Sequence, residues 1–298
     1  MLIKTSDLKT IKPFLKQLSL PKPRSYKGQN GKLLIIGGSS LFHAASIWSA
    51  AIASRIVDIV HYASTKENEQ VFINLKSKFV DGIVVKQKDL EQYVKEDDCI
   101  LAGPGMVRGE VSPKLLEILK IKHEPSYTYY LIKYLIENFP KKKFVFDAGA
   151  LQMMEKSWLL KLKEKPILTP HQVEFQTLFN IDIKNLNMLH KKNIVKQVAK
   201  KYHAIILVKA VNDIISDGQE VFEIKGGNAG LTKGGTGDIL AGLISALNAK
   251  NSQLVSAITA SFLLKKSAEE LFEKSSFWYN ASDLVYQIPK TMKIIFNS

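Results

Sequence analysis

The chain of 298 residues is 46% hydrophobic and 23% charged, as in globular proteins with a large core, and has no apolar run near the ~20 residues of a membrane span. A single cysteine, Cys99, excludes an intrachain disulfide framework, and the N-terminus lacks the features of a secretory signal, so we expect a cytoplasmic protein with no membrane partner. The net charge of +14 comes almost entirely from scattered lysines, which favours a solvated surface that attracts anionic nucleotides.

Residues 1–30 predict an N-terminal helix followed by a connector rich in proline, lysine and glycine. From residue 32 onward, apolar runs of strand length alternate with segments of helical periodicity. This alternation predicts an α/β fold with a mostly parallel central sheet and helices on both faces. The expected elements are strand Lys32–Ile36, helix Leu41–Ile56, strands Ile59–Ser64, Ile83–Val85 and Cys99–Ala102, helices Ser112–Leu119 and Tyr127–Asn138, strand Phe144–Asp147, helix Asn187–Tyr202, strand Ile205–Val208 and helix Ile239–Leu247.

The remaining segments predict a hairpin, two further helices and a surface elaboration. Asp213–Ser216 and Val221–Ile224 flank Asp217-Gly218 and predict one antiparallel hairpin. Two further helices are expected at Leu254–Phe272 and Asn280–Pro289, and residues 110–140 are interpreted as a surface elaboration. Because there is no internal repeat and no low-complexity linker, we expect a single domain over residues 1–298.

A glycine-rich segment from Gly226 to Asp238 leads into an apolar helix that is expected to begin near Thr236. Glycines permit sharp turns and close approach of backbone to a ligand, and the N–H groups at a helix start form an anion site. The segment is not a Walker loop, because no G-K-[ST] follows the glycines. We expect a phosphate turn at the start of this helix, although an acidic first turn also suits a plain helix start. The expected turn comprises Gly234, Gly235, Thr236 and Gly237.

The segment from Thr169 to Phe175 reads T-P-H-Q-V-E-F. Its spacing matches a capping box from Thr169 to Gln172 with Pro170 in the first helical position, so a well-capped helix is one interpretation. The functional interpretation places His171 beside a ligand, with Glu174 one turn later reaching a magnesium ion through water. These two side chains alone are too few for a metal site of their own.

Small or polar residues follow several predicted strands, at Gly37–Ser40, Gly103–Gly105, Asp147 and Lys209. Ligands of open parallel sheets gather at the carboxyl ends of strands, although each of these features is also compatible with a plain turn, a helix cap or a surface lysine. The other histidines have no metal-ligand spacing and are interpreted as structural: His43, His61, His123, His190 and His203.

In this order, the motifs resemble those of the ADP/ATP-dependent NAD(P)H-hydrate dehydratases, a carbohydrate-kinase-like branch of the ribokinase superfamily. The resemblance runs from about residue 25 to about residue 290 and implies a ribokinase-like fold. The chain departs from the family pattern at His43 and Ala210, where glycine is usual. The matching segments are K-L-L-I-I-G-G-S-S, H-A-A, A-G-P-G-M, V-F-D-A-G-A-L, I-L-T-P-H-Q-V-E-F, V-K-A-V-N-D, G-N-A-G-L-T-K-G-G-T-G-D-I-L-A-G and N-A-S-D-L.

The resemblance also implies roles for individual residues. Asp238 would be the catalytic base that takes the proton of the C6 hydroxyl of hydrated NADH or NADPH, which is then phosphorylated and loses phosphate. The hydrated dinucleotide would contact Ala44, Gly105, His171 and Asp238. The adenine nucleotide would contact Lys209, Ala210, Val211, Asn212, Asp213 and Gly237.

The resemblance implies ADP or ATP as co-substrate and Mg²⁺ between its phosphates. It also implies a homo-oligomer, with a tetramer as one option, and a separate NAD(P)HX epimerase as functional partner, because the 30 leading residues are too few to form that domain. The nearest alternative is a ribokinase-fold kinase acting on a thiazole, pyrimidine or sugar hydroxyl. The other alternative, a lysine-rich nucleic-acid-binding protein, is disfavoured because arginine occurs only at positions 24, 55 and 108.

Overall fold

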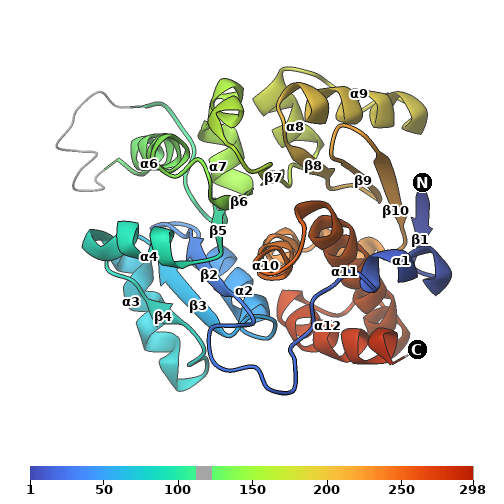
Figure 1. Ribbon diagram of the computed structural model, residues 1–298, viewed down its shortest axis with the longest axis horizontal. Helices are drawn as coiled ribbons and strands as arrows, with labels where there is room; N and C mark the ends of the chain where they lie inside the picture. Colours follow the sequence, from blue (N-terminus) through green and yellow to red (C-terminus); the bar gives the residue numbers. More distant parts are fainter. Residues whose placement is uncertain (112–122, 298) are drawn as a thin grey trace.

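The protein is described by a computed structural model over residues 1–111 and 123–297 (Figure 1). In this part of the chain ten strands form one sheet, in the order β1-β10-β9-β8-β7-β6-β5-β2-β3-β4. The strands are β1 Leu2–Lys4, β2 Lys32–Ile36, β3 Ile59–Ala63, β4 Ile83–Val84, β5 Cys99–Ala102, β6 Lys143–Phe146, β7 Ile167–Leu168, β8 Ile205–Val208, β9 Asn212–Ser216 and β10 Val221–Lys225.

The sheet is mostly parallel, as predicted. Only β9 runs against its neighbours, pairing antiparallel with both β8 and β10. The predicted hairpin is therefore confirmed, and β9 adds a second antiparallel pair with β8. In the described residues the nine strands other than β9 share one direction, so their carboxyl ends lie at one edge.

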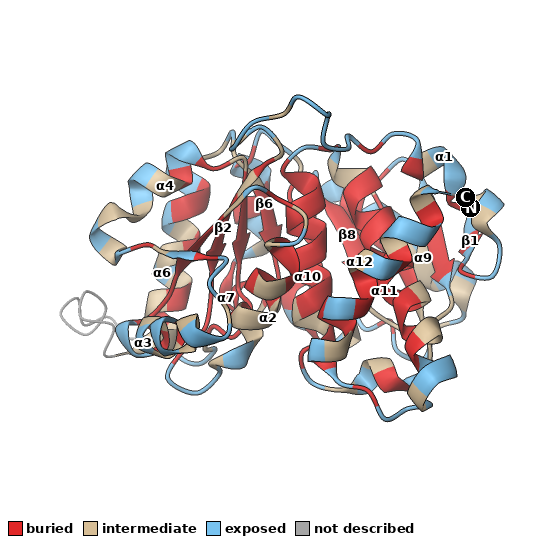
Figure 2. Cartoon of the chain, turned by 90° about the horizontal axis from the view of Figure 1, so that it is seen from below, coloured by how far each residue is buried: buried red, intermediate tan, exposed pale blue. Residues whose placement is uncertain are grey.

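Helices cover both faces of this sheet, which confirms the predicted architecture. Alternate residues of each strand divide between two cores: Leu33 and Ile35 of β2 face one side, and Leu34 and Ile36 face the other. Figure 2 shows α10 and α11 as mainly buried helices at the centre of the molecule. The helices are α1 Lys12–Leu15, α2 Ala44–Ala53, α3 Lys66–Asn74, α4 Leu90–Glu96, α6 Glu124–Asn138, α7 Ala148–Met153, α8 Gln172–Phe179, α9 Met188–Lys201, α10 Thr236–Asn248, α11 Gln253–Ser275 and α12 Ala281–Phe296.

Three expectations differ from the structure. The chain starts with strand β1 and not with a helix, because Leu2–Lys4 pairs with β10, more than 200 residues away, which local periodicity does not reveal. Strand β7 was not predicted, since two buried residues are too short for a periodic signal. Within the segment 110–140, α6 buries Ile132 and Leu135 in the core and is not a surface elaboration, whereas the predicted helix 112–119 lies outside the described residues.

No helix in the described ranges is long and apolar enough to cross a membrane.

Candidate active site

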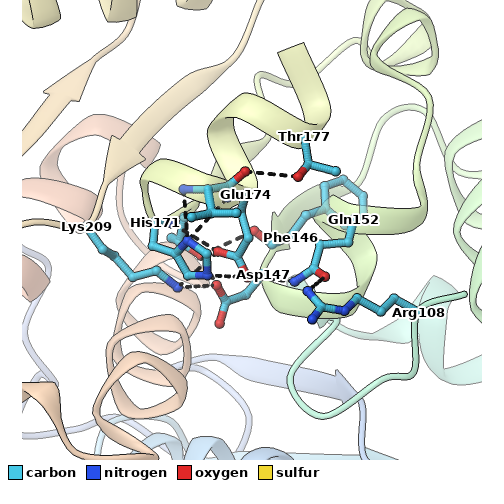
Figure 3. Close-up of polar contacts among 10 residues, drawn as sticks. Arg108, Phe146, Asp147, Gln152, His171, Glu174, Thr177 and Lys209 are labelled. Atoms are coloured by element: carbon cyan, nitrogen blue, oxygen red, sulfur yellow. Dashed lines mark hydrogen bonds and ion pairs between the residues drawn. The ribbon is translucent and has the colours of Figure 1, made fainter. Parts of the chain in front are cut away.

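The carboxyl ends of neighbouring strands bring together residues that are far apart in the sequence. Asp147 follows β6, Thr169 follows β7 and Lys209 follows β8, and these strands are adjacent in the sheet. Lys209 Nζ lies 2.7 Å from Asp147 Oδ1 and 3.8 Å from Glu174 Oε2 of α8 (Figure 3). Thr169 Oγ1 donates to Asp147 Oδ1 at 2.8 Å. One lysine therefore compensates two buried carboxylates at the edge where parallel sheets bind ligands.

Asp147 occupies a sharp turn between β6 and α7. Ala148 has φ of 44°, a left-handed conformation that costs free energy for a residue with a Cβ and that gathers at functional sites. Asp147 is the N-cap of α7 by position, but its side chain makes no capping hydrogen bond. The carboxylate instead contacts Thr169 and Lys209, so the helix-cap interpretation of Asp147 is wrong and its side chain belongs to the site.

The start of α8 corrects the predicted capping box. His171, not Thr169, is the N-cap: its Nδ1 accepts from the amides of Val173 and Glu174, and Glu174 Oε2 accepts from the amide of His171 at 2.9 Å. Because Nδ1 accepts two N–H groups, the proton of the neutral imidazole is on Nε2. Nε2 lies 3.5 Å from Glu174 Oε1, and the ring is about half exposed. His171 thus presents a fixed N–H donor at the site.

Two further residues that sequence reasoning did not identify support Glu174. Gln152 of α7 donates through Nε2 to Glu174 Oε1 at 2.9 Å, and Arg108 Nη1 in turn donates to Gln152 Oε1 (Figure 3). Arg108 is one of only three arginines in the chain, and this scarcity was the one signal that could have pointed to it. The pair holds the Glu174 carboxylate in one orientation.

The glycine-rich segment forms the turn before α10. Gly235 is the N-cap with φ of 95°, and a Cβ there would lie 2.6 Å from the Trp48 ring and 2.7 Å from Ala281, so the turn requires glycine. Helix α10 begins at Thr236, as predicted, with Asp238 in its first turn. Gly237 lies beside Lys209, since a Cβ on it would be 3.5 Å from Lys209 Nζ. The positive end of α10 and the ammonium group of Lys209 therefore face the same place.

Burial raises the pKa of Asp238 from 3.8 to about 7; the carboxylates of Asp147 and Glu174 act in the same direction and the Lys209 ammonium opposes them. Burial lowers the pKa of Lys209, but Asp147 and Glu174 outweigh it, so that this pKa lies above its usual value. A pKa raised in this direction suits a carboxyl group that accepts a proton from a ligand near neutral pH.

Two of the residues expected to contact the substrate, Ala44 and Gly105, lie on neighbouring turns. Ala44 is the exposed first residue of α2, and Gly105, with φ of 73°, packs against the chain just before it, since a Cβ there would be 2.7 Å from the carbonyl oxygen of Phe42. Helix α2 also reaches α10, because Ser49 Oγ donates to the carbonyl oxygen of Asp238 at 2.8 Å. His43 precedes Ala44, and its Nδ1 is 2.9 Å from Asn68 Oδ1.

The segment Lys209–Asp213 comprises the turn between β8 and β9 and the first two residues of β9. Lys209 points into the carboxylate pair, Asp213 is buried, and the side chain of Val211 is 89% exposed. The positive-φ residues other than glycine in the described ranges do not include Ala210, so this alanine occupies its turn without left-handed strain. The departure from glycine at position 210 is therefore compatible with the loop.

The family model described as NAD(P)H-hydrate dehydratase matches residues 33–290 of this chain, which covers the sheet from β2, the turn before α10 and most of α12. The chain belongs to the NAD(P)H-hydrate dehydratase family. The match includes Asp147, Glu174, Lys209 and Asp238.

Relatives named within the family are of two lengths. The chain is 32% identical over 288 residues to the bifunctional NAD(P)H-hydrate repair enzyme Nnr of Methanocaldococcus jannaschii, with 94% of this chain and 52% of that protein covered. It is 28% identical to the ADP-dependent (S)-NAD(P)H-hydrate dehydratase of Nitrosopumilus maritimus, with 91% and 92% covered. The chain therefore spans about half the length of the bifunctional relatives and nearly all of the shorter one.

Solved structures confirm the ribokinase-like fold. A ribokinase-like superfamily protein of Enterococcus faecalis matches with a TM-score of 0.79 at 20% identity and covers 99% of this chain and 96% of its own. The ADP/ATP-dependent NAD(P)H-hydrate dehydratase of Bacillus subtilis, co-crystallised with ATP/Mg²⁺, matches with a TM-score of 0.73 at 20% identity, covering 96% and 97%. At this identity the likeness establishes the fold alone.

Proposed function

We propose that this protein is an ADP- or ATP-dependent dehydratase that converts hydrated NADH or NADPH back to the reduced dinucleotide, with Asp238 as the base. The observation that carries the proposal is a carboxylate with a pKa of about 7 in the first turn of a helix, beside the Lys209 ammonium group. The family assignment and the shorter relatives, named as dehydratases of this substrate, support it.

The chemistry follows from these groups. Asp238 accepts the proton of the C6 hydroxyl while the hydroxyl oxygen forms a bond to the terminal phosphorus and the phosphoanhydride bond breaks. Lys209 and the first-turn N–H groups of α10 stabilise the charge on the transferred phosphoryl group. Phosphate is a better leaving group than hydroxide, so the C6–O bond then breaks and a ring proton is lost, which restores the double bond. We assign the hydrated dinucleotide to His171, Gly105 and Ala44. We assign the adenine nucleotide to the segment Lys209–Asp213 and to Gly237.

The residues fit a magnesium ion that is held mainly by the nucleotide phosphates. No cluster of three or more His, Cys, Asp or Glu side chains able to hold a metal occurs among the described residues. Mg²⁺ commonly retains several waters and uses one or two carboxylates together with substrate phosphates. Asp147 and Glu174 would supply these carboxylates through water, and the ion would neutralise phosphate charge.

The assay of hydrated NADH or NADPH with ADP or ATP and Mg²⁺ tests the function. We expect recovery of the near-ultraviolet absorbance of the reduced nicotinamide, with one phosphate released per molecule restored and no recovery without nucleotide. Spectra and phosphate release are measured on the same sample. No recovery, together with a stable phosphate ester formed on a thiazole, pyrimidine or sugar alcohol, would instead identify a kinase of the same fold.

The pH dependence of kcat/KM reports on the base. Because Asp238 must be ionised to accept a proton, we expect kcat/KM to rise about tenfold per pH unit below a pKa of about 7 and to level above it. Asp147→Asn removes a carboxylate that raises this pKa, so its acid limb should move to lower pH. The matched variant Asp182→Asn, in the exposed segment between α8 and α9, should keep the wild-type profile. An acid limb that Asp147→Asn leaves in place would contradict the electrostatic coupling.

Two partners are part of the proposal. A separate NAD(P)HX epimerase is assigned as functional partner, supported by the bifunctional relatives, in which the matching part is only about half of the protein. We also propose that the enzyme is a homo-oligomer.

A further inference from the structure

Helix α11 carries a polar stripe through the interior of the molecule. Ser261, Lys265 and Glu269 are spaced four residues apart and therefore lie on one face of the helix. Ser261 and Lys265 are buried, at 0% and 3% exposure, within a helix that Figure 2 shows as largely buried. A buried lysine requires partners for its charge, and a residue such as methionine would fill the same space without them.

All three partners of Lys265 belong to Lys209–Asp213, the segment that comprises the turn after β8 and the first two residues of β9. Lys265 Nζ donates to the carbonyl oxygens of Val211 at 2.8 Å and Ala210 at 3.2 Å, and lies 3.4 Å from Asp213 Oδ1. This is the segment assigned above to the adenine nucleotide. The charge on α11 is thus satisfied entirely by the backbone and the carboxylate of that loop.

Asp213 completes the arrangement. Its Oδ1 accepts from the amide of Ala210 at 2.9 Å, and its Oδ2 accepts from Ser261 Oγ at 2.7 Å. Both backbone polar groups of Ala210 and the carbonyl of Val211 are therefore turned toward the interior. The side chain of Val211 is left on the outside, 89% exposed. An apolar side chain held outward on a loop with its polar groups turned inward suits the face of a purine base.

The same stripe contacts the glycine-rich segment. Glu269 Oε1 accepts from the amide of Gly227 at 2.9 Å, and Asn228 Nδ2 donates to the carbonyl of Ala268 at 2.8 Å. A Cβ on Gly227 would lie 3.3 Å from Lys265 Cγ. Helix α11 therefore contacts both the loop before β9 and the segment that leads to Asp238.

We propose that Lys265 is a positioning residue for the adenine nucleotide: together with Asp213 and Ser261 it fixes the loop Lys209–Asp213 so that Val211 faces the base. Lys265 acts through the loop, since its ammonium group contacts loop atoms. The inference rests on the proposed function, because it is that function which assigns the nucleotide to this loop. A lysine that served only the stability of the core would leave nucleotide affinity unchanged.

Lys265→Met tests the proposal, because methionine keeps the unbranched stem and removes the charge. We expect the Kd of ADP and ATP, measured by calorimetry without hydrated substrate, and the nucleotide KM to rise about tenfold or more. The kcat at saturating nucleotide and the KM of the hydrated dinucleotide should stay within about threefold of wild type. Lys196→Met, on the exposed face of α9, is the control for loss of one positive charge. It should leave the nucleotide Kd, the nucleotide KM, the kcat and the KM of the hydrated dinucleotide unchanged.

Ser261→Ala is the second variant, because it removes one hydrogen bond to Asp213 from a helix that tolerates alanine. Like Lys265→Met, it should weaken nucleotide binding, here by about threefold. If Lys265→Met does not fold, Ser261→Ala tests the proposal in its place. Unchanged nucleotide affinity in a folded Lys265→Met, or a loss of kcat with an unchanged nucleotide KM, would overturn the proposal. Wild-type protein that binds no adenine nucleotide would overturn both this inference and the proposed function. Binding without recovery of NADH would overturn only the function, and the binding comparison would still decide the role of Lys265.

Discussion

Replacing Asp238 with asparagine is expected to lower kcat by about 10²–10⁴-fold, because the amide keeps the shape of the carboxylate but accepts no proton. The adenine nucleotide should still bind at wild-type affinity or better, since the neutral amide removes a negative charge near the phosphates. Turnover is measured by recovery of the reduced nicotinamide and binding by calorimetry. A kcat near that of wild type would remove Asp238 from the mechanism.

The same variant should be more stable than wild type at alkaline pH. The folded-state pKa of Asp238 is raised from 3.8 to about 7, so the folded protein retains a proton that the unfolded chain releases. Between these two pH values the wild-type protein loses stability as pH rises, and the whole penalty is present above pH 7. Asp238→Asn avoids it, and we expect a gain on the order of 2–4 kcal/mol in the free energy of unfolding at pH 8.

Urea unfolding at two pH values separates this effect from any change in packing. The advantage of Asp238→Asn should shrink toward zero at about pH 3, where the aspartate is protonated in both states of the wild-type protein. Asp182→Asn, which removes an exposed carboxylate, is the matched control and should show no such difference. A variant less stable than wild type at pH 8 would contradict the assignment of a strained, desolvated carboxylate.

Replacing Lys209 with methionine is expected to cost about 3–5 kcal/mol of stability, because it leaves buried carboxylates without their cation. Asp147 is 2% exposed at its side chain and Glu174 5%, and both pair with this ammonium group. Loss of Lys209 also removes the group that lowers the pKa of Asp238, so the acid limb of residual activity should move to higher pH. The expected direction is opposite to that of Asp147→Asn.

The double variant Lys209→Met/Asp147→Asn distinguishes an unpaired charge from lost packing. Neutralising Asp147 should recover part of the stability lost in the single variant, because one of the unpaired carboxylates is then absent. Lys196→Met controls for the loss of one positive charge on the surface. Free energies of unfolding are compared at pH 7; a loss below about 1 kcal/mol in Lys209→Met, the usual contribution of an exposed ion pair, would show that the pair is not desolvated.

Features that depend on neighbours in the sequence were predicted well. The start of α10 at Thr236 and the strand-helix alternation follow from glycine and from hydrophobic periodicity, which report on three to eight successive residues. The predicted capping box at Thr169 was wrong although it was local. His171 caps α8 in place of Thr169, and the hydroxyl of Thr169 donates to Asp147, a partner 22 residues away.

By itself the sequence determined the α/β class, the order of the motifs and the turn that places Asp238 at a helix N-terminus, because these depend on local conformational preference. Tertiary structure alone decided that Asp147, Glu174 and Lys209 meet there, since adjacent strand ends bring them within 4 Å. It also decided the pKa of Asp238, because burial and neighbouring charge, which raise it to about 7, exist only once the chain has folded.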